Sequence, residues 1–270
     1  MIDISGIDYT ELDIPQVLMV LFHPRPEYGR RSASEQSVEV MIPVEAKVEI
    51  GARFHIAGLA SPNILFFHGN GEIVADYDDM APFYTGMNIN FLAVDYRGYG
   101  RSGGQPTVTH MMRDCHIIFQ FVRTWLDKQA CSGPLLVMGR SLGSASALEL
   151  AANYRDQIDG LIIESGFAWA EPLLALLGVE TPALKKKGDS FSHTQKIKAF
   201  NKPTLIIHAE YDHIIPFTDG LALFEASPAR EKFLLKIPGA NHNDIFFRGL
   251  SEYLAAIKAL AEKIMDGTRP

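Results

Sequence analysis

The sequence predicts a single domain of the α/β class, built on a mostly parallel sheet with helices on both faces. From about residue 36 onward, short strand-like segments alternate with longer helical segments, and Gly, Pro, Asn or Asp residues separate them. Apolar residues make up 47% of the 270 residues, which is enough to bury a large core. Most of the predicted strands are apolar throughout, a pattern typical of parallel strands that helices cover on both faces.

Eight segments are expected to form the strands of this sheet. In chain order they are Val38–Pro43, Val48–Ala57, Asn63–Phe67, Asn90–Val94, Leu135–Met138, Gly160–Ile163, Thr204–His208 and Phe233–Ile237. The first two alternate between apolar and polar residues, which predicts an antiparallel edge beside the parallel strands.

Longer segments with apolar residues at helical spacing are expected to form the helices. They are Val74–Gly86, Val108–Lys128, Leu142–Tyr154, Phe217–Ala226 and Asp244–Ile264. Asp244 stands where the N-cap of the last helix is expected. Residues 1–35, with three prolines, are expected to form an irregular lead-in that packs on the domain of residues 36–270.

Charge and hydropathy exclude several classes of partner. The formal net charge of −7 repels nucleic-acid phosphates, so no nucleic-acid partner is expected. Residues 1–24 hold four acidic side chains and no Lys or Arg, which is the wrong charge for a secretory signal. Their strongest apolar stretch, Val17–Phe22, is too short to cross a bilayer. We therefore expect a cytoplasmic protein without an integral membrane segment, and no pattern predicts its oligomeric state.

Gly139-Arg140-Ser141-Leu142-Gly143 fits the pattern Gly-x-Ser-x-Gly between a predicted strand and a predicted helix. A turn this tight strains the serine and leaves no room for a Cβ two residues to either side, which explains the two glycines. The strand–turn–helix context favours a nucleophile elbow over a plain glycine-rich turn. Ser141 is therefore the predicted nucleophile.

A serine hydroxyl needs a base to accept its proton, and His242 is the predicted base. Catalytic groups of open α/β sheets lie on loops at the carboxyl ends of strands, and His242 follows the last predicted strand. His208 ends a strand as well, but it precedes the acid candidate and is expected to be a packed residue. His193 and His213 are expected to be structural or exposed.

An acid must hold the imidazole in the correct tautomer, and Asp212, just past a predicted strand, is the first candidate. The order Ser141, Asp212, His242 is one of those in which the three groups are known to occur. Glu164 also follows a strand in an allowed order and stays open as an alternative acid. Asp95 precedes the serine and is better explained as a brace for the turn after its own strand.

Negative charge that develops on a carbonyl oxygen must meet preorganised donors. The backbone N–H of Leu142, directly after the serine, is one expected donor. The backbone N–H of Asn70, in the turn His68-Gly69-Asn70-Gly71 after the third strand, is expected to complete the oxyanion hole. His68 is expected to organise that loop rather than to act as a second base.

Together these segments resemble the α/β-hydrolase superfamily, in particular its small serine hydrolases. The resemblance rests on His-Gly-Asn-Gly at 68–71, Asp-Tyr-Arg-Gly-Tyr-Gly-x-Ser at 95–102 and Gly-Arg-Ser-Leu-Gly at 139–143, and it runs from about residue 36 to the end. It implies the α/β-hydrolase fold with an eight-stranded sheet and a small cap at about residues 165–200. It also implies hydrolysis through an acyl-enzyme, without a metal or organic cofactor. Ala209 and Glu210 depart from the residues common in such relatives, but neither is a triad position.

Two other patterns, one for a dinucleotide site and one for a metal site, are not supported by the residues around them. Gly98–Gly103 has the spacing of a dinucleotide loop, but Pro106 delays the helix that would face a pyrophosphate. His208, Asp212 and His213 match no familiar metal spacing, and both cysteines lack a ligand spacing as well. Neither a metal nor a nucleotide cofactor is expected.

The predicted function is that of a serine hydrolase of the carboxylesterase or thioesterase kind, acting on small-molecule acyl substrates of small to medium size. Amide or peptide hydrolysis, and a non-catalytic binding protein with the same fold, are the alternatives. The segment Phe167–Val179 is expected to act as a substrate-contacting cap or as packed core. As a cap with Trp169 over Ser141, it predicts that kcat/KM rises from acetyl to about butyryl or hexanoyl esters and then falls.

Overall fold

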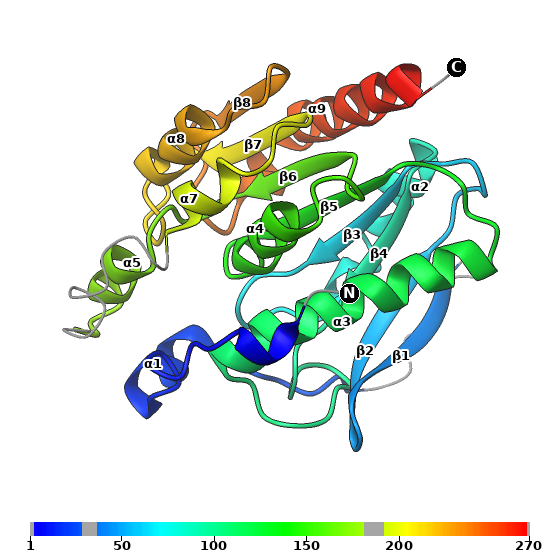
Figure 1. Ribbon diagram of the computed structural model, residues 1–270. Coiled ribbons are helices and arrows are strands. Elements are labelled where there is room, and N and C mark those ends of the chain that lie inside the picture. The colour runs from blue at the N-terminus through cyan, green and yellow to red at the C-terminus, as the bar shows by residue number, and fades with distance from the viewer. Residues whose placement is uncertain (1–2, 29–36, 181–191, 269–270) are drawn as a thin grey trace.

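The computed structural model describes residues 3–28, 37–180 and 192–268 (Figure 1). Eight strands form one sheet in the order β1-β2-β4-β3-β5-β6-β7-β8. β2 pairs antiparallel with both β1 and β4, whereas the pairings from β4 to β8 are parallel. The predicted fold class and the predicted antiparallel edge are therefore confirmed.

The strands agree with the predicted segments to within two residues at each end. They are β1 (Ser37–Glu45), β2 (Val48–His55), β3 (Asn63–Phe67), β4 (Asn90–Val94), β5 (Leu135–Arg140), β6 (Gly160–Glu164), β7 (Thr204–Ala209) and β8 (Lys232–Ile237). β5 and β6 run past their predicted ends because Arg140 pairs with Glu164 in the sheet register. The carboxyl edge of the sheet therefore carries two charged residues within strands that are otherwise apolar.

The helices of the structure differ from the predicted ones at several places. They are η1 (Ile4–Gly6), α1 (Pro15–Leu21), η2 (Val74–Tyr77), α2 (Ala81–Gly86), α3 (Val108–Lys128), α4 (Gly143–Asn153), α5 (Ala170–Leu176), α7 (His193–Ile197), α8 (Phe217–Ala226) and α9 (Ile245–Thr268). The prediction of one helix over Val74–Gly86 is wrong because Pro82, which lacks a backbone N–H, fits only the first turn of a new helix. Asp244 does directly precede α9, but its carboxylate accepts the backbone N–H of Asn241, upstream of the helix.

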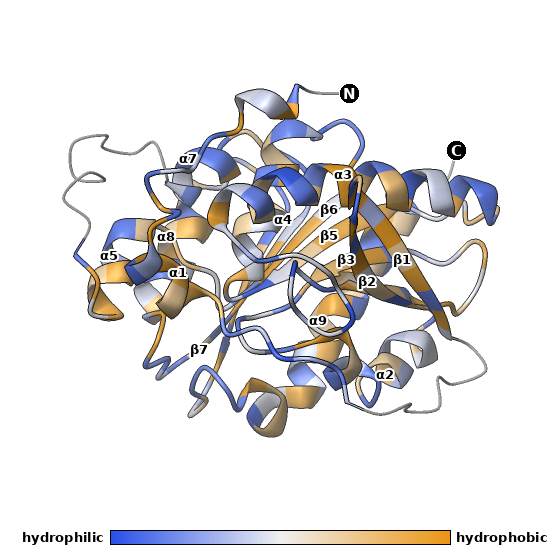
Figure 2. Ribbon diagram, turned by 90° about the horizontal axis from the view of Figure 1, so that it is seen from below, coloured by the Kyte–Doolittle hydropathy of each residue, from blue (hydrophilic) through white to orange (hydrophobic). Residues whose placement is uncertain are grey.

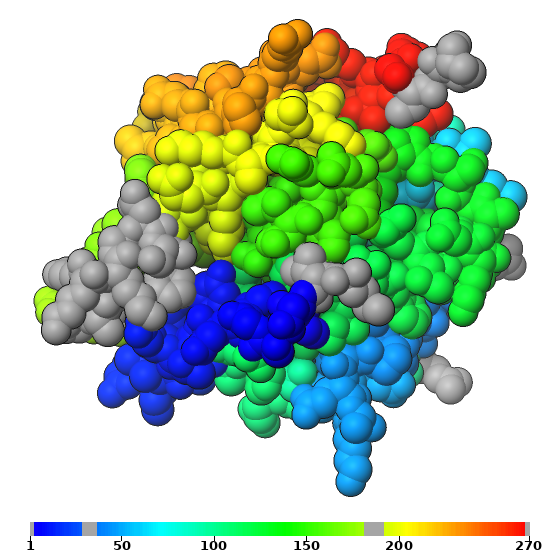
Figure 3. All heavy atoms as spheres, viewed as in Figure 1, coloured from blue at the N-terminus to red at the C-terminus, as the bar shows by residue number. Residues whose placement is uncertain are grey.

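The lead-in before β1 is more regular than expected, because it contains η1 and α1. Pro15 stands in the first turn of α1, where its missing N–H costs no helical hydrogen bond. The segment is tied to the start of α3, since the Tyr9 N–H donates to Thr109 Oγ1 at 3.0 Å and Arg113 Nε donates to Ile7 O at 2.8 Å. In Figure 3 the lead-in, in blue, lies against the green atoms of this region. These hydrogen bonds join the described residues 3–28 to α3, and the division of the chain at residues 35 and 36 stays a prediction.

Two apolar clusters fill the space on the two faces of the sheet. Helices α3, α4 and α8 cover one face, and α2 and α9 cover the other (Figure 1). Phe119 and Leu148 are fully buried on the first face, and Phe91 and Tyr253 on the second. Figure 2 shows the strands in orange between helices whose outer faces are blue. Each large apolar side chain that is fully buried contributes about 1.5–3 kcal/mol, so the two clusters hold the sheet and its polar carboxyl edge in place.

Candidate active site

Ser141 lies at the tip of a tight turn between β5 and α4. Its φ of +51° is in the left-handed region that residues with a Cβ seldom adopt. A Cβ on Gly139 would collide with the carbonyl oxygen of Gly143, and one on Gly143 would collide with the carbonyl oxygen of Phe67. The Ser141 N–H donates to the Glu164 carbonyl oxygen at 2.8 Å and so ties the turn to β6. Close backbone approach therefore requires both glycines.

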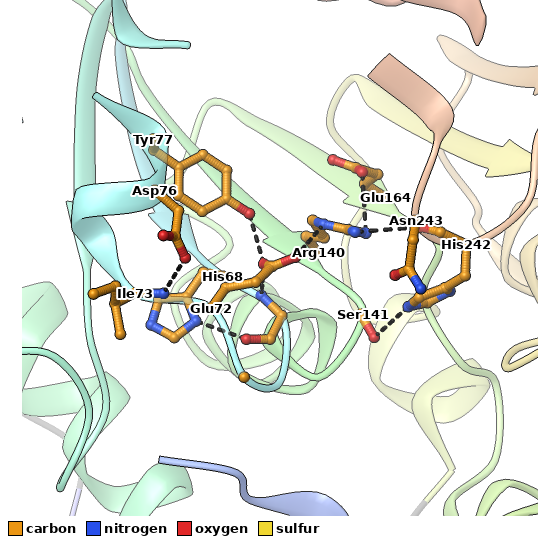
Figure 4. A network of polar contacts seen from close by, with 12 residues as sticks. His68, Glu72, Ile73, Asp76, Tyr77, Arg140, Ser141, Glu164, His242 and Asn243 are labelled. Carbon is orange, nitrogen blue, oxygen red and sulfur yellow. Dashed lines mark hydrogen bonds and ion pairs between the residues drawn. The ribbon is translucent and has the colours of Figure 1, made fainter. Parts of the chain in front are cut away.

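The structure brings Ser141, His242 and Asp212 into one hydrogen-bonded chain, the Ser–His–Asp chain. His242 Nε2 lies 2.9 Å from Ser141 Oγ, and His242 Nδ1 lies 2.7 Å from Asp212 Oδ2. Figure 4 shows the serine and histidine side chains directed at each other. An ionised aspartate only accepts, so Nδ1 carries the imidazole proton and Nε2 is left to accept from the serine hydroxyl.

The Asp212 carboxylate is fixed from two sides. Its other oxygen, Oδ1, accepts the backbone N–H groups of Ile214 at 3.0 Å and Ile215 at 2.8 Å. Burial by itself would raise the pKa of Asp212, but the hydrogen bond and charge of His242 outweigh burial and hold the pKa below its ordinary value. Asp212 is therefore ionised at neutral pH and orients the imidazole.

The alternative acid, Glu164, is engaged elsewhere. It is fully buried at the end of β6, where Oε2 accepts the Tyr253 hydroxyl at 2.8 Å and Oε1 lies 3.3 Å from Arg140 Nη1. Burial raises the pKa of this carboxyl in spite of the nearby guanidinium. Because the His242 Nδ1 is already held by Asp212, the geometry favours Asp212 over Glu164 as the acid.

Two other polar residues near this edge have structural partners. His208 is fully buried, its Nε2 donates to the Ile215 carbonyl oxygen at 2.9 Å, and burial lowers its pKa. Asp95 Oδ1 accepts the Val74 N–H at 2.9 Å and lies 3.1 Å from His68 Nε2. Both contacts of the Asp95 carboxylate are with the loop after β3 and the start of η2, so they do not support the prediction that it braces the turn after its own strand. His68 lies in that loop, and its Nδ1 is 2.8 Å from the Gly69 carbonyl oxygen, as expected for a residue that organises the loop.

The two expected oxyanion donors, Asn70 and Leu142, both lie on the wall of the cavity that contains Ser141. The Asn70 side chain is anchored away from it, since Oδ1 accepts the His23 N–H at 2.7 Å and the Tyr99 hydroxyl at 2.8 Å. Within the part of the chain that the structure describes, neither backbone N–H has an acceptor. Unpaired donors beside a serine hydroxyl suit a developing oxyanion.

A second buried network, here called the arginine network, joins the elbow to the loops on both sides (Figure 4). Its members are Arg140, Glu72, Tyr77, Glu164 and Tyr253. Arg140 Nε donates to Glu72 Oε1 at 3.0 Å, and Nη2 donates to the His242 carbonyl oxygen at 3.2 Å. One guanidinium therefore reaches the oxyanion loop, β6 and the histidine loop.

Glu72 carries the arginine network into the loop that holds Asn70. Its Oε2 accepts the Gly69 N–H at 2.6 Å and the Tyr77 hydroxyl at 2.7 Å. This network was not predicted from the sequence. The signal was the charged residue Arg140 at the end of an apolar strand, because a buried charge requires charged or polar partners.

The cavity beside Ser141 has a volume of about 310 Å³ and mostly apolar walls. Three parts of the chain supply them, namely Val20 and Leu21 of α1, Phe167, Leu173 and Leu177 around α5, and Ile214 and Ile215 after β7. The expectation that Trp169 overhangs the serine is wrong, since this side chain is 37% exposed and lies off the cavity wall. Its backbone bridges to Ser192, and Phe167, two residues earlier, lies on the wall. Residues 181–191 of the expected cap lie outside the described residues.

Among residues 3–28, 37–180 and 192–268, no group of His, Cys, Asp and Glu side chains is arranged to hold a metal ion. In the same ranges, no helix has both the length and the apolar character needed to cross a membrane. The cytoplasmic location and the lack of a nucleic-acid partner stay predictions.

Comparison with known sequences gives matches over most of the chain. A family model described as serine aminopeptidase, S33, matches residues 60–188. Human alpha/beta hydrolase domain-containing protein 17B is 34% identical over 208 residues, which are 73% of this chain and 67% of that protein. Alpha/beta hydrolase domain-containing protein 17C of Mus musculus is 32% identical over 201 residues, which are 72% of this chain and 58% of that protein.

Solved structures share the fold at lower identity. The Pyrococcus furiosus esterase Pf2001 superposes with a TM-score of 0.71 at 17% identity, over 89% of this chain and 98% of the esterase. Est1E from Butyrivibrio proteoclasticus, with ferulic acid bound, gives a TM-score of 0.69 at 17% identity, over 84% of this chain and 99% of Est1E. These likenesses concern the fold alone.

Proposed function

Because the chain belongs to the α/β-hydrolase family, we propose that it is a serine hydrolase that cleaves carboxylic ester or thioester bonds of small to medium acyl groups. The observation that carries the proposal is the Ser–His–Asp chain, which ends on a serine hydroxyl in a cavity of about 310 Å³ with mostly apolar walls. The esterases among the structural neighbours are compatible with this chemistry, though their likeness extends only to the fold.

In the first half-reaction, the Ser141 hydroxyl attacks the acyl carbon while His242 Nε2 takes its proton. Asp212, ionised and hydrogen-bonded to Nδ1–H, stabilises the imidazolium that forms. The charge that develops on the carbonyl oxygen is met by the backbone N–H groups of Asn70 and Leu142. His242 then gives its proton to the departing alcohol or thiol, and an acyl-enzyme remains on Ser141.

In the second half-reaction, water takes the place of the alcohol or thiol. His242 removes a proton from the water as it attacks the acyl carbon, and returns that proton to Ser141 Oγ as the acyl bond breaks. Every role in both halves is filled by a protein group, so the proposed reaction calls for no metal or organic cofactor.

Amide or peptide hydrolysis is the second candidate, because the matching family model is described as a serine aminopeptidase. A substrate with a free amino terminus would need a carboxylate on the cavity wall to pair with its charge. Within the described part of the chain, Glu72 is the acidic side chain on that wall, and both its oxygens are taken by Arg140, Gly69 and Tyr77. Neutral esters and thioesters fit this cavity better.

A fluorophosphonate probe and a substrate panel test the proposal together. We expect covalent labelling, and turnover of p-nitrophenyl esters and acyl-CoA thioesters that exceeds turnover of aminoacyl amides by about 10²-fold or more, since the wall offers no pairing for an ammonium group. Labelling with faster amide cleavage would support the second candidate. A folded protein that is neither labelled nor active would indicate a non-catalytic binding protein.

A further inference from the structure

A second apolar cavity lies behind the wall of the active-site cavity. It has a volume of about 40 Å³ and is enclosed by the lead-in and by α3, α4, α5 and α7. Four residues line both cavities, namely Leu21, Leu142, Phe167 and Leu173. Four side chains therefore separate the reacting serine from a further apolar space, and nothing in the Ser–His–Asp chain or the arginine network accounts for that space.

Leu142 gives the second cavity a defined position relative to the chemistry. Its backbone N–H is a proposed donor to the substrate carbonyl oxygen, and its side chain lies between the two cavities. An acyl group attached to Ser141 with its oxygen at that donor has its distal carbons near the same side chain. Movement of the Phe167 or Leu173 side chain, which are rotatable apolar groups on the partition, would open the passage.

The far side of the second cavity is polar. Lys196 of α7 lies on its wall, donates to the Tyr9 hydroxyl at 3.1 Å and forms an ion pair with Glu149 at 2.8 Å. Glu149 also contacts His116 Nε2 at 3.3 Å and accepts from Asn153 Nδ2 at 3.1 Å. An apolar chain end in contact with this ion pair would displace the water around the two charges and offer no polar group in its place, which is unfavourable. The ion pair therefore limits the apolar space on this side.

We propose that the second cavity is an acyl-chain subsite, which receives the distal methylenes of the substrate acyl group and which the Lys196–Glu149 ion pair closes at its far end. This inference rests on the proposed function. Each methylene that leaves water for an apolar cavity raises kcat/KM by about fourfold until the space is full. The size of the second cavity therefore sets the preferred chain length.

Two substitutions change the size of the second cavity in opposite directions. Ala170 and Met112 line the second cavity but not the first, so neither lies on the cavity wall that holds Ser141. Ala170→Phe fills the space, and Met112→Ala enlarges it. Ala222→Phe is the matched control, because Ala222 is also a half-buried helical alanine packed on the same apolar cluster and lies outside both cavities.

The readout is kcat/KM for p-nitrophenyl esters from acetyl to dodecanoyl, with near-ultraviolet circular dichroism to confirm that each variant is folded. For Ala170→Phe we expect acetyl ester turnover within about twofold of the wild type and hexanoyl turnover lowered by about tenfold or more, the equivalent of nearly two lost methylenes. Met112→Ala should move the optimum to chains about two carbons longer. Ala222→Phe should leave the profile unchanged.

The possible outcomes separate this inference from the proposed function. Chain-length profiles that match the wild type in both folded variants, or a loss that is equal for all chain lengths, would overturn the subsite while ester hydrolysis stands. If Ala170→Phe does not fold, the lengthened optimum of Met112→Ala still decides the matter. A wild type that cleaves no ester of any length would overturn the proposed function and this inference with it.

Discussion

The Ser–His–Asp chain and the arginine network meet at neighbouring residues, Arg140 and Ser141, yet they differ in how they end. The Ser–His–Asp chain ends on a serine hydroxyl at the wall of a cavity. The arginine network closes on itself and on backbone groups, because the Arg140 guanidinium reaches Glu72, Glu164 and a carbonyl oxygen. The first arrangement leaves a group available to a substrate, whereas the second holds segments in place.

Charge separates the two regions as well. In the arginine network one guanidinium faces two carboxyls. Burial by itself would lower the pKa of Arg140, but the charges of Glu72 and Glu164 outweigh burial and raise it. Burial alone would raise the pKa of Glu72, but Arg140 and the Tyr77 hydroxyl hold it below its ordinary value, whereas the pKa of Glu164 is raised. His242 joins the two regions, with its ring in one and its carbonyl oxygen in the other. We therefore propose that the Ser–His–Asp chain carries out the reaction and that the arginine network positions the segments around it.

The largest effect is expected at the open end of the Ser–His–Asp chain. Ser141→Ala should abolish fluorophosphonate labelling and lower ester turnover by about 10³-fold or more, because it removes the group that bonds to the acyl carbon. The fold should persist, which circular dichroism can check. Labelling that survives in a folded variant would move the nucleophile to another residue.

Exchange of one carboxyl in each network tests which acid serves His242. Asp212→Asn should lower kcat by about 10³- to 10⁴-fold, because an amide in this position favours the wrong imidazole tautomer. Glu164→Gln should lower kcat by less than about tenfold, since Glu164 bonds to Arg140 and Tyr253. Steady-state kinetics of the two variants decide, and the reverse ranking would transfer the role to Glu164.

A smaller effect is expected from the centre of the arginine network. Arg140→Lys should lower kcat by about 10- to 10²-fold with KM within about threefold, because a lysine cannot hold Glu72 and the His242 carbonyl together. Arg97→Lys is the control, since Arg97 is buried to the same extent and pairs with Asp114 far from the serine in sequence and outside its cavity. The control should lower the melting temperature and leave kcat unchanged. Equal losses of kcat in both variants would contradict a positioning role.

The smallest effect concerns pH and stability. The folded-state pKa of Glu164 is raised above 4.5, so its contribution to stability is full below pH 4.5 and is lost as pH rises through the folded-state pKa. We expect the melting temperature of Glu164→Gln, relative to the wild type, to be lowest near pH 4.5 and to increase toward pH 8. Thermal unfolding at several pH values measures this difference. Asp212 has the opposite sign, because its lowered pKa places the loss of its contribution below pH 3.8.

The local sequence was sufficient to predict a feature wherever the residues of one segment by themselves restrict its conformation or its burial. The strands could be predicted because parallel strands buried on both faces must be apolar along their length. The elbow around Ser141 could be predicted because a side chain at either of its two glycines would clash with backbone close by. A Cβ on Gly139 would meet Gly143, and a Cβ on Gly143 would meet Phe67 of the adjacent strand. Asp212 and His242 could be proposed as candidates because each comes shortly after a strand, and the apolar pattern shows where those strands end.

Only the tertiary structure shows which residues from distant parts of the sequence contact each other at the site. Asp212 lies just past a strand and Glu164 at the end of one, and their partners could not be predicted from that position, since Asp212 meets His242 whereas Glu164 meets Arg140 and Tyr253. Likewise, Phe167 lies on the cavity wall and Trp169 does not, although both belong to the same short apolar segment. The hydropathy pattern along one segment indicates which of its faces tends to be buried. Contacts between side chains at the carboxyl edge of the sheet depend on how separate segments pack against one another. The sequence of a single segment does not contain that information.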